Sequence, residues 1–294
     1  MNIAFVWQGI TEAEPRWRDG LYWAMKEIEK KHSVSYFEPW GDIQGDVVLY
    51  WEAPCTANGV NASYYDRVRR LPIRKALLFA GGPIVKNWVD GFDHAFVESK
   101  INKDEFDSIN VPNSVAFGVN ADVFKPINQD KIYQGIHHGT SASWKRQWLM
   151  AEALGSNALV VGRHQKEDPY PFDRSRELGA TVLHEQPAGK INQLLNQSIC
   201  LVQTSEFWGG GQRATLEALS AGIPVVCMTD SPKNREYVEE SGAGLVVDPD
   251  VHRIREAVQE VTKWERPCKK GRDYVLSKWT HQHYANNLLN WIEL

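Results

Sequence analysis

The sequence is poor in cysteine, and its cysteines do not form the spacings that metal sites or disulfide frameworks use. Only four occur among 294 residues, and they lie far apart without a Cys-x-x-Cys pair: Cys55, Cys200, Cys227 and Cys268. This excludes a zinc ribbon and a small disulfide-rich scaffold. Cys200 and Cys227 stand in apolar runs, so we expect buried thiols in a reducing compartment.

Long apolar runs and an excess of one charge are also missing. No run approaches the ~20 apolar residues of a membrane span, and the first residues lack the basic segment of a signal peptide. The net charge is −4, from 33 basic and 37 acidic residues. This balance argues against a general nucleic-acid binder or a strongly basic membrane-surface protein. We expect a cytoplasmic protein.

Three common catalytic motifs are absent as well. The chain has no Gly-x-Ser-x-Gly elbow, no His-Glu-x-x-His and no Walker lysine motif, which disfavours a serine hydrolase, a zinc protease and a P-loop enzyme. The adjacent His137 and His138 are not expected to share a metal ion, because neighbouring strand residues point to opposite faces. Tryptophan is unusually frequent, with 12 residues. They serve either packing or a surface that stacks on sugars or bases.

Short apolar runs alternate with helical stretches along the whole chain, the pattern of parallel sheets covered on both faces. The rhythm breaks once and then restarts, which predicts an α/β protein with two doubly wound domains, residues 1–122 and 123–274. The apolar runs that we interpret as strands are 3–7, 46–51, 75–80 and 94–97 in the first domain, and 131–136, 158–162, 180–183, 199–202, 223–228 and 244–247 in the second. In such folds the ligand lies at the carboxyl ends of the strands.

A glycine-rich turn lies between one of these strands and a helix. Gly209, Gly210 and Gly211 permit positive φ angles and close approach of backbone N–H groups to a ligand. The helix that follows offers unpaired N–H groups and a positive dipole end, which suit a diphosphate. Arg213 adds a guanidinium, and Glu217 can accept hydrogen bonds from ribose hydroxyls. Taken alone, the glycine run favours a plain reading, a flexible turn with Glu217 as a solvated helix residue.

The whole stretch from Thr204 to Val226 is more specific. It resembles the donor-binding signature of the retaining, GT-B-fold glycosyltransferases of the glycogen-synthase and sucrose-synthase-like group, a glycosyltransferase family 4-like set also called glycosyl transferases group 1. Residues 216–226, Leu-Glu-Ala-Leu-Ser-Ala-Gly-Ile-Pro-Val-Val, match its second half closely. Residues 234–238, 242–249 and 117–126 also fit. The resemblance extends from about 115 to 250, and in the first 110 residues it is only architectural.

The resemblance implies a GT-B fold, two Rossmann-like domains facing a central cleft. The first would be the acceptor side, with a carboxyl-terminal helix at about 275–294 packed back on it, and the second would bind the donor. The implied activity is transfer of a sugar from a nucleotide diphosphate-sugar, such as a UDP- or GDP-sugar, to an acceptor hydroxyl. The family further implies retention of anomeric configuration, no metal and no cofactor besides the donor substrate.

The resemblance also assigns residues. Lys145, Glu206 and Arg213 would be catalytic, with Lys145 on donor phosphate and Glu206 on the donor sugar. The expected substrate-binding positions are Gly9, Gly81, Gly82, Arg163, His184, Gly209, Gly210, Gly211, Gln212, Thr215 and Glu217. The acceptor would enter from the first domain, near Gln8, Trp17 and Trp51. A glycan, a lipid or a small molecule fits, and a modified nucleic acid fits less well because the pI is low. The oligomeric state stays open.

Two departures from the family pattern keep other functions in view. The family has Glu-x7-Glu, but counting back from Glu217 reaches Gly209, so Glu206 would serve only across a longer loop. The family histidine of the first domain is also missing, and Gly81, Gly82 or Glu52 would replace it. The alternatives are a nucleotide-sugar or glycan-binding protein without catalysis and a nucleotide-sugar epimerase.

Overall fold

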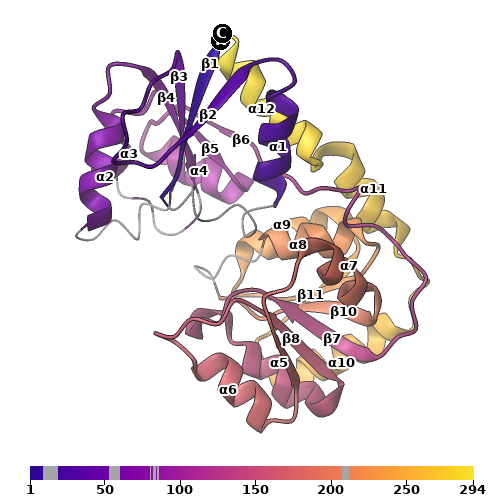
Figure 1. Cartoon of the computed structure of the whole chain (residues 1–294). Coiled ribbons are helices and arrows are strands. Elements are labelled where there is room, and N and C mark those ends of the chain that lie inside the picture. Colours follow the sequence, from indigo (N-terminus) through magenta and orange to yellow (C-terminus); the bar gives the residue numbers. More distant parts are fainter. Residues whose placement is uncertain (9–18, 53–59, 80, 82–83, 85, 207–211) are drawn as a thin grey trace. The chain divides into compact units, whose positions relative to one another are not determined.

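The computed structural model describes residues 1–8, 19–52, 60–79, 81, 84, 86–206 and 212–294. It forms two compact units, each built on one parallel sheet (Figure 1). Unit 1 comprises residues 1–118 and 281–294, and unit 2 comprises 119–280. The units therefore divide four residues before the predicted junction, and the chain returns to unit 1 at residue 281 rather than near 275. The predicted α/β class is confirmed.

The sheet of unit 1 has six parallel strands in the order β2-β1-β3-β4-β5-β6. Their bounds are β1 Asn2–Val6, β2 Ser33–Phe37, β3 Val47–Glu52, β4 Arg74–Phe79, β5 His94–Val97 and β6 Asn113–Val115. The central strands are buried along nearly their whole length, as their continuous apolar runs predicted. The strand order reverses between β1 and β3, so the carboxyl ends of these two strands form the switch point of this sheet.

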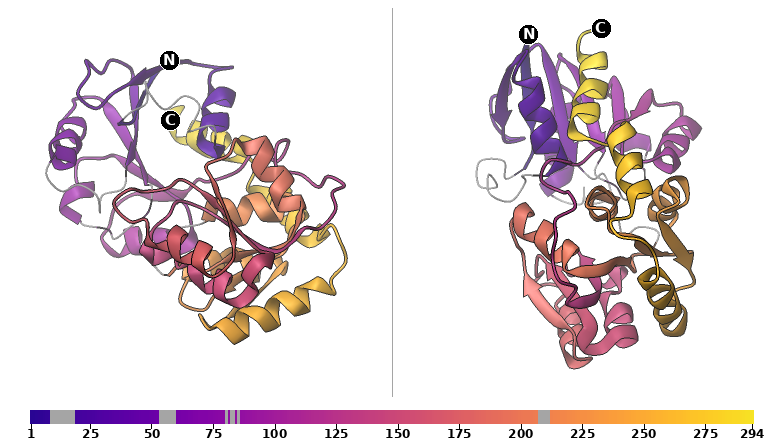
Figure 2. Two further views of the ribbon diagram at one scale, coloured as in Figure 1. Left: turned by 60° about the horizontal axis from the view of Figure 1, so that its bottom comes forward. Right: turned by 90° about the vertical axis from the view of Figure 1, so that its right-hand side faces the viewer.

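Helices cover both faces of the unit 1 sheet. Their bounds are α1 Gly20–Ile28, α2 Val60–Arg69, α3 Lys86–Val89, α4 Lys100–Ser108 and α12 His281–Ile292. Helix α1 begins where Asp19 accepts hydrogen bonds from the amides of Leu21 and Tyr22. It packs against α12, and the apolar faces of these two helices join one core with β1 and β3 (Figure 2).

The sheet of unit 2 also has six parallel strands, in the order β12-β11-β10-β7-β8-β9. Their bounds are β7 Tyr133–His138, β8 Ala158–Gly162, β9 Thr181–His184, β10 Ser198–Gln203, β11 Val225–Met228 and β12 Gly244–Val247. The order reverses between β7 and β10. The loops that follow these two strands are therefore the place to look for a bound ligand.

The helices of unit 2 connect these strands. Their bounds are α5 Gln147–Leu154, α6 Tyr170–Glu177, α7 Ala188–Asn196, α8 Gln212–Ser220, α9 Pro232–Ser241, α10 Val251–Thr262 and α11 Lys269–Lys278, with two short 3₁₀ turns, Ser143–Lys145 and Gly155–Asn157. Apolar residues of α5, α6 and α10 form one core with the sheet. Helix α8 lies between α7 and α9, and α11 packs against it.

Two glycines of the family-like segment have direct structural reasons. Gly222 ends α8 in the left-handed conformation, with φ +70°, and a Cβ there would lie 2.7 Å from Pro267 Cβ. Gly244 starts β12 so close to β11 that a Cβ would lie 2.0 Å from the carbonyl oxygen of Val225. Both positions thus require glycine so that α8, β11 and β12 can pack against their neighbours.

Some elements differ from the sequence prediction. The helix expected from Trp144 to Ala153 is a 3₁₀ turn and a separate α-helix, divided at Arg146. The strands β2 and β6, at the two edges of the unit 1 sheet, were not predicted. Among the described residues, no helix is long and apolar enough to cross a membrane.

Candidate functional site

The loop after β7, residues 139–146, lies at the switch point of unit 2 and is anchored to the loop after β8. We call it the β7 loop. The amides of Gly139 and Ser141 donate to the carbonyls of Val161 and Arg163, at 2.9 and 2.7 Å. The Ser143 hydroxyl and amide both donate to the Asp168 carboxylate. One side of the β7 loop is therefore held in place before any ligand arrives.

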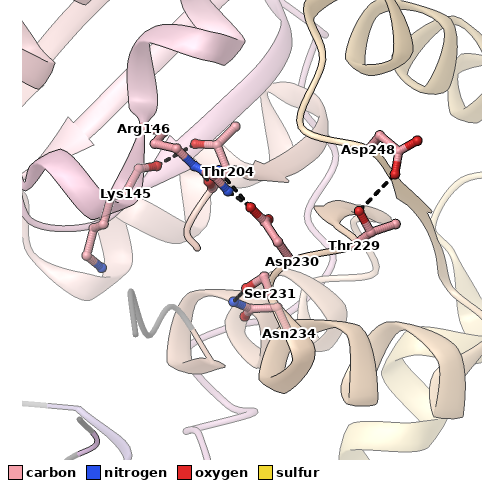
Figure 3. A network of polar contacts seen from close by, with 8 residues as sticks. All are labelled: Lys145, Arg146, Thr204, Thr229, Asp230, Ser231, Asn234 and Asp248. Carbon is pink, nitrogen blue, oxygen red and sulfur yellow. Dashed lines mark hydrogen bonds and ion pairs between the residues drawn. The ribbon is translucent and has the colours of Figure 1, made fainter. Parts of the chain in front are cut away.

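Arg146 holds the other side of the β7 loop. Its backbone is left-handed, with φ +48° and ψ +38°, an uncommon conformation for a residue other than glycine. Its guanidinium makes a two-pronged contact with Asp230, which follows β11, at 2.8 Å for each N–O pair. The same group donates through Nε to the carbonyl of Thr204, which follows β10, at 2.9 Å. Arg146 thus joins the loops after three strands (Figure 3).

The loop after β10 also binds the backbone of the β7 loop. The Thr204 hydroxyl donates to the Lys145 carbonyl at 2.6 Å, and the Glu206 amide donates to the Trp144 carbonyl at 3.0 Å. Thr204 is fully buried, whereas Glu206 is half-buried. Two residues assigned from the resemblance, Lys145 and Glu206, are therefore neighbours across the switch point.

The side chain of Lys145 extends away from the Arg146–Asp230 pair (Figure 3). Its Nζ lies 3.1 Å from the point that a Cβ on Gly139 would occupy, so the amine lies directly over the start of the β7 loop. Glycine leaves the space that this arrangement needs. A cation is thereby placed at the carboxyl end of β7, where an anionic ligand would bind.

Two histidines end β7 and point to opposite sides of the sheet. His137 is fully buried, and burial first, then the charges of Lys145 and His138, hold its pKa well below the usual value. It is therefore neutral. His138 lies on the α8 side, where its Nδ1 is 3.2 Å from Glu217 Oε2, although the pair lacks hydrogen-bond geometry. Glu217 is only 4% exposed, so it is not the solvated helix residue of the plain reading.

The first turns of α8 are tied to α9. The buried Thr215 hydroxyl donates to the Asn234 amide oxygen at 2.7 Å, and the Asn234 amide donates to Ser231 at 2.9 Å. Gln212 is buried, and its amide nitrogen has no hydrogen-bond partner among the described residues. Arg213, the next residue, is exposed. Of the predicted site residues on α8, Gln212, Thr215 and Glu217 are thus buried, and Arg213 is exposed.

The remaining predicted positions lie at the edges of this site or outside the described part. Arg163 and His184, after β8 and at the end of β9, have exposed side chains. Gly81 follows β4 in unit 1 with φ +92°, where a Cβ would meet no atom within 4 Å. The other predicted glycines, Gly9, Gly82, Gly209, Gly210 and Gly211, and also Trp17, fall outside the described residues.

At the switch point of unit 1, a buried carboxylate and two tryptophans end the adjacent strands β1 and β3. Glu52 is 8% exposed, and Tyr50 donates to it at 3.4 Å. Burial, and then the nearby Glu52 charge, raise the pKa of Tyr50. Trp7 and Trp51 contact each other edge to face, with centroids 5.1 Å apart. This edge combines an aromatic surface with a hydrogen-bond acceptor.

Sequence reasoning missed Arg146, Asp168 and Asp230. Nothing in the sequence marks the two aspartates, which stand in loops without a motif, and Arg146 is not among the residues that the resemblance assigns. Among the described residues, no group of three or more His, Cys, Asp or Glu side chains is placed to hold a metal ion.

Comparisons with known proteins agree with this architecture. Residues 154–275 match the family described as glycosyl transferases group 1. Sucrose-phosphate synthase from Thermosynechococcus elongatus has a similar structure, with a TM-score of 0.78 and 13% identity over 100% of this chain and 98% of that one. A glycosyltransferase from Rickettsia africae gives 0.74 and 14% identity over 98% and 97%. No curated protein matches the chain in sequence.

HepE from Anabaena, in complex with UDP and glucose, also has this architecture. It gives a TM-score of 0.72 and 15% identity over 100% of this chain and 99% of that one. At such identities these likenesses establish the fold, and the family match independently covers the segment from the end of α5 to α11. The resemblance seen in the sequence is thus confirmed: the chain has the GT-B fold, and residues 154–275 carry the region of the glycosyl transferases group 1 family.

Proposed function

We propose that this protein is a glycosyltransferase that uses a nucleotide diphosphate-sugar as donor. The observation that carries the proposal is the position of Lys145, on an anchored loop at the switch point of unit 2 and next to Glu206. The family match over residues 154–275 and the UDP complexes of structural neighbours support the same activity.

In this proposal, positive charge stabilises the diphosphate as it leaves. The bond between the anomeric carbon and the diphosphate oxygen breaks, the acceptor oxygen bonds to that carbon, and the acceptor's proton passes to the leaving diphosphate. Negative charge grows on the leaving oxygen as its bond breaks. Lys145, Arg213 and the amino end of α8 supply positive potential there, which is the largest demand of the reaction. Because these groups meet it, we propose that no metal ion is required. We propose retention of the anomeric configuration from the resemblance to the retaining glycosyltransferases alone.

Two carboxylates would orient the donor. Glu217 is buried near His138, and its Oε2 has no hydrogen-bond partner among the described residues, so its carboxylate would accept hydrogen bonds from ribose hydroxyls. Glu206, half-buried beside Trp144 and Lys145, would bind the sugar hydroxyls. The acceptor hydroxyl would enter on unit 1, at the edge formed by Trp7, Trp51 and Glu52.

A ligand panel tests the proposal. Uridine and guanosine diphosphates and their sugar derivatives should raise the unfolding temperature of the wild type, since ligand at 100 times its Kd adds about 2.7 kcal/mol. Lys145→Ala and Glu217→Ala should each reduce the shift. Lys263→Ala, a change at an exposed ion pair on the same unit, should retain it. A folded wild type that no nucleotide stabilises would refute the proposal.

Turnover separates the enzyme from a binding protein. With the stabilising donor and a library of sugar, lipid and small-molecule acceptors, the nucleoside diphosphate should be released, and a chelator should leave the rate unchanged. Proton NMR of the product should show the anomeric configuration of the donor. Binding without release for every acceptor would instead indicate a nucleotide-sugar-binding protein.

A further inference from the structure

Three residues surround the backbone of Lys145 without being near its amine. Arg146, Thr204 and Asp230, which we call the Lys145 clamp, come from the loops after β7, β10 and β11. Thr204 contacts the carbonyl of Lys145 itself, and Arg146 binds the carbonyl of Thr204 and both oxygens of Asp230 (Figure 3). The side chain of Lys145 points the other way.

The clamp maintains a conformation that the chain would not adopt by itself. A left-handed backbone is unfavourable for a residue with a Cβ, so Arg146 occupies it only because its contacts compensate. The turn at Arg146 separates the 3₁₀ turn Ser143–Lys145 from α5, and so decides where Lys145 points. The Arg146 side chain is 16% exposed and its contact with Asp230 is two-pronged, an arrangement more rigid than most surface ion pairs.

We propose that the Lys145 clamp is a positioning device: the Arg146–Asp230 pair and Thr204 set the Lys145 amine for the donor diphosphate, and Arg146 itself is not a phosphate ligand. This inference rests on the proposed function. Three guanidinium N–H groups of Arg146, one on each nitrogen, donate to Asp230 and to the Thr204 carbonyl, while the Lys145 amine lies over Gly139.

Asp230→Asn separates this idea from simple electrostatics by the sign of its effect. Removing a negative charge near a bound diphosphate, or releasing Arg146 to reach it, should tighten binding. Loss of positioning should weaken it, because a displacement of about 1 Å can cost up to ~100-fold in function. We expect roughly 10-fold weaker binding of uridine or guanosine diphosphate, measured by isothermal titration calorimetry.

Three comparisons complete the experiment. Glu256→Gln removes one negative charge from the same unit at an exposed pair with Arg253 and should leave the affinity unchanged. In a Lys145→Ala background, Asp230→Asn should have no further effect, since its effect acts through Lys145. Thr204→Val, which removes only the hydroxyl on the Lys145 carbonyl, should also weaken binding, and it replaces Asp230→Asn if that variant fails to fold.

The outcomes are distinct. Failure of the wild type to bind either nucleotide refutes the proposed function. Wild-type binding together with equal or tighter binding by a folded Asp230→Asn, or an undiminished effect of this change in the Lys145→Ala background, overturns the clamp alone. A merely structural role would lower the stability of these variants but leave the nucleotide affinity of the folded fraction intact.

Discussion

The contact between β8 and the β7 loop depends on a glycine, and one methyl group should disrupt it. Gly162 ends β8, where a Cβ would lie 2.0 Å from the Gly139 carbonyl oxygen and 2.5 Å from its carbon. Gly162→Ala must therefore move two backbones apart by about 1 Å, because no flexible side chain can yield instead. Overpacking of this kind costs typically 1–3 kcal/mol, and we expect the upper end.

Urea unfolding, monitored by tryptophan fluorescence, would measure this loss of stability. The expected loss is a large part of the 5–15 kcal/mol that is typical for the free energy of unfolding of a folded protein. Gly189→Ala is the matched control: it lies in α7, nothing stands within 4 Å of its Cβ, and the change should stabilise by about 0.5–1 kcal/mol. Because Gly139 lies beneath Lys145, Gly162→Ala should also weaken nucleoside diphosphate binding. If Gly162→Ala and the wild type unfold within 0.5 kcal/mol of each other, or Gly189→Ala loses as much, the reasoning fails.

Two further predictions concern titrating groups. Burial, and then the charge of Arg74, lower the pKa of His94 to about 4. As the pH decreases from 6.5 to 4, the unfolded chain binds a proton at His94 before the folded chain does, so the free energy of unfolding decreases. Since His94 is only half-buried, we expect a loss of roughly 1–2 kcal/mol over this range. His94→Asn should make the free energy of unfolding depend less on pH, as measured by urea titrations at several pH values. Burial raises the pKa of Cys200 and Cys227 to about 12, so native protein should leave both unlabelled by a thiol reagent at pH 8 while Cys268 reacts. Rapid labelling of either buried thiol without denaturant would contradict the packing described for β10 and β11.

The sequence predicted those strands that are apolar on both faces. The run Val47–Tyr50 is continuous because β3 is buried on both sides, and such runs carry a strong signal. The edge strand β2, Ser33–Phe37, alternates between exposed and half-buried residues, and β6 has only three residues. Neither offers enough apolar length to stand out from a loop.

The segment that resembles the family could be recognised from a linear motif, whereas the residues that hold the neighbouring loops in place could not. Residues 216–226 form one helix-to-strand unit, from α8 into β11, in which Gly222 is required locally, so a short segment identifies it. Arg146, Asp168 and Asp230 act through contacts between residues 25 to 84 positions apart. The left-handed turn at Arg146 is imposed by those contacts against local preference, and for that reason a continuous helix was wrongly predicted from Trp144.

The pairing of α1 with α12 has a consequence for the order in which the chain acquires structure. Unit 2 is one continuous segment, so its contacts can all form once residue 280 has left the ribosome. Unit 1 needs residues 281–294 as well, and until then the core that α1 shares with β1 and β3 lacks the apolar side chains of α12. Of the two units, the one whose first residues come earlier in the chain would thus be the later one to have all of its residues.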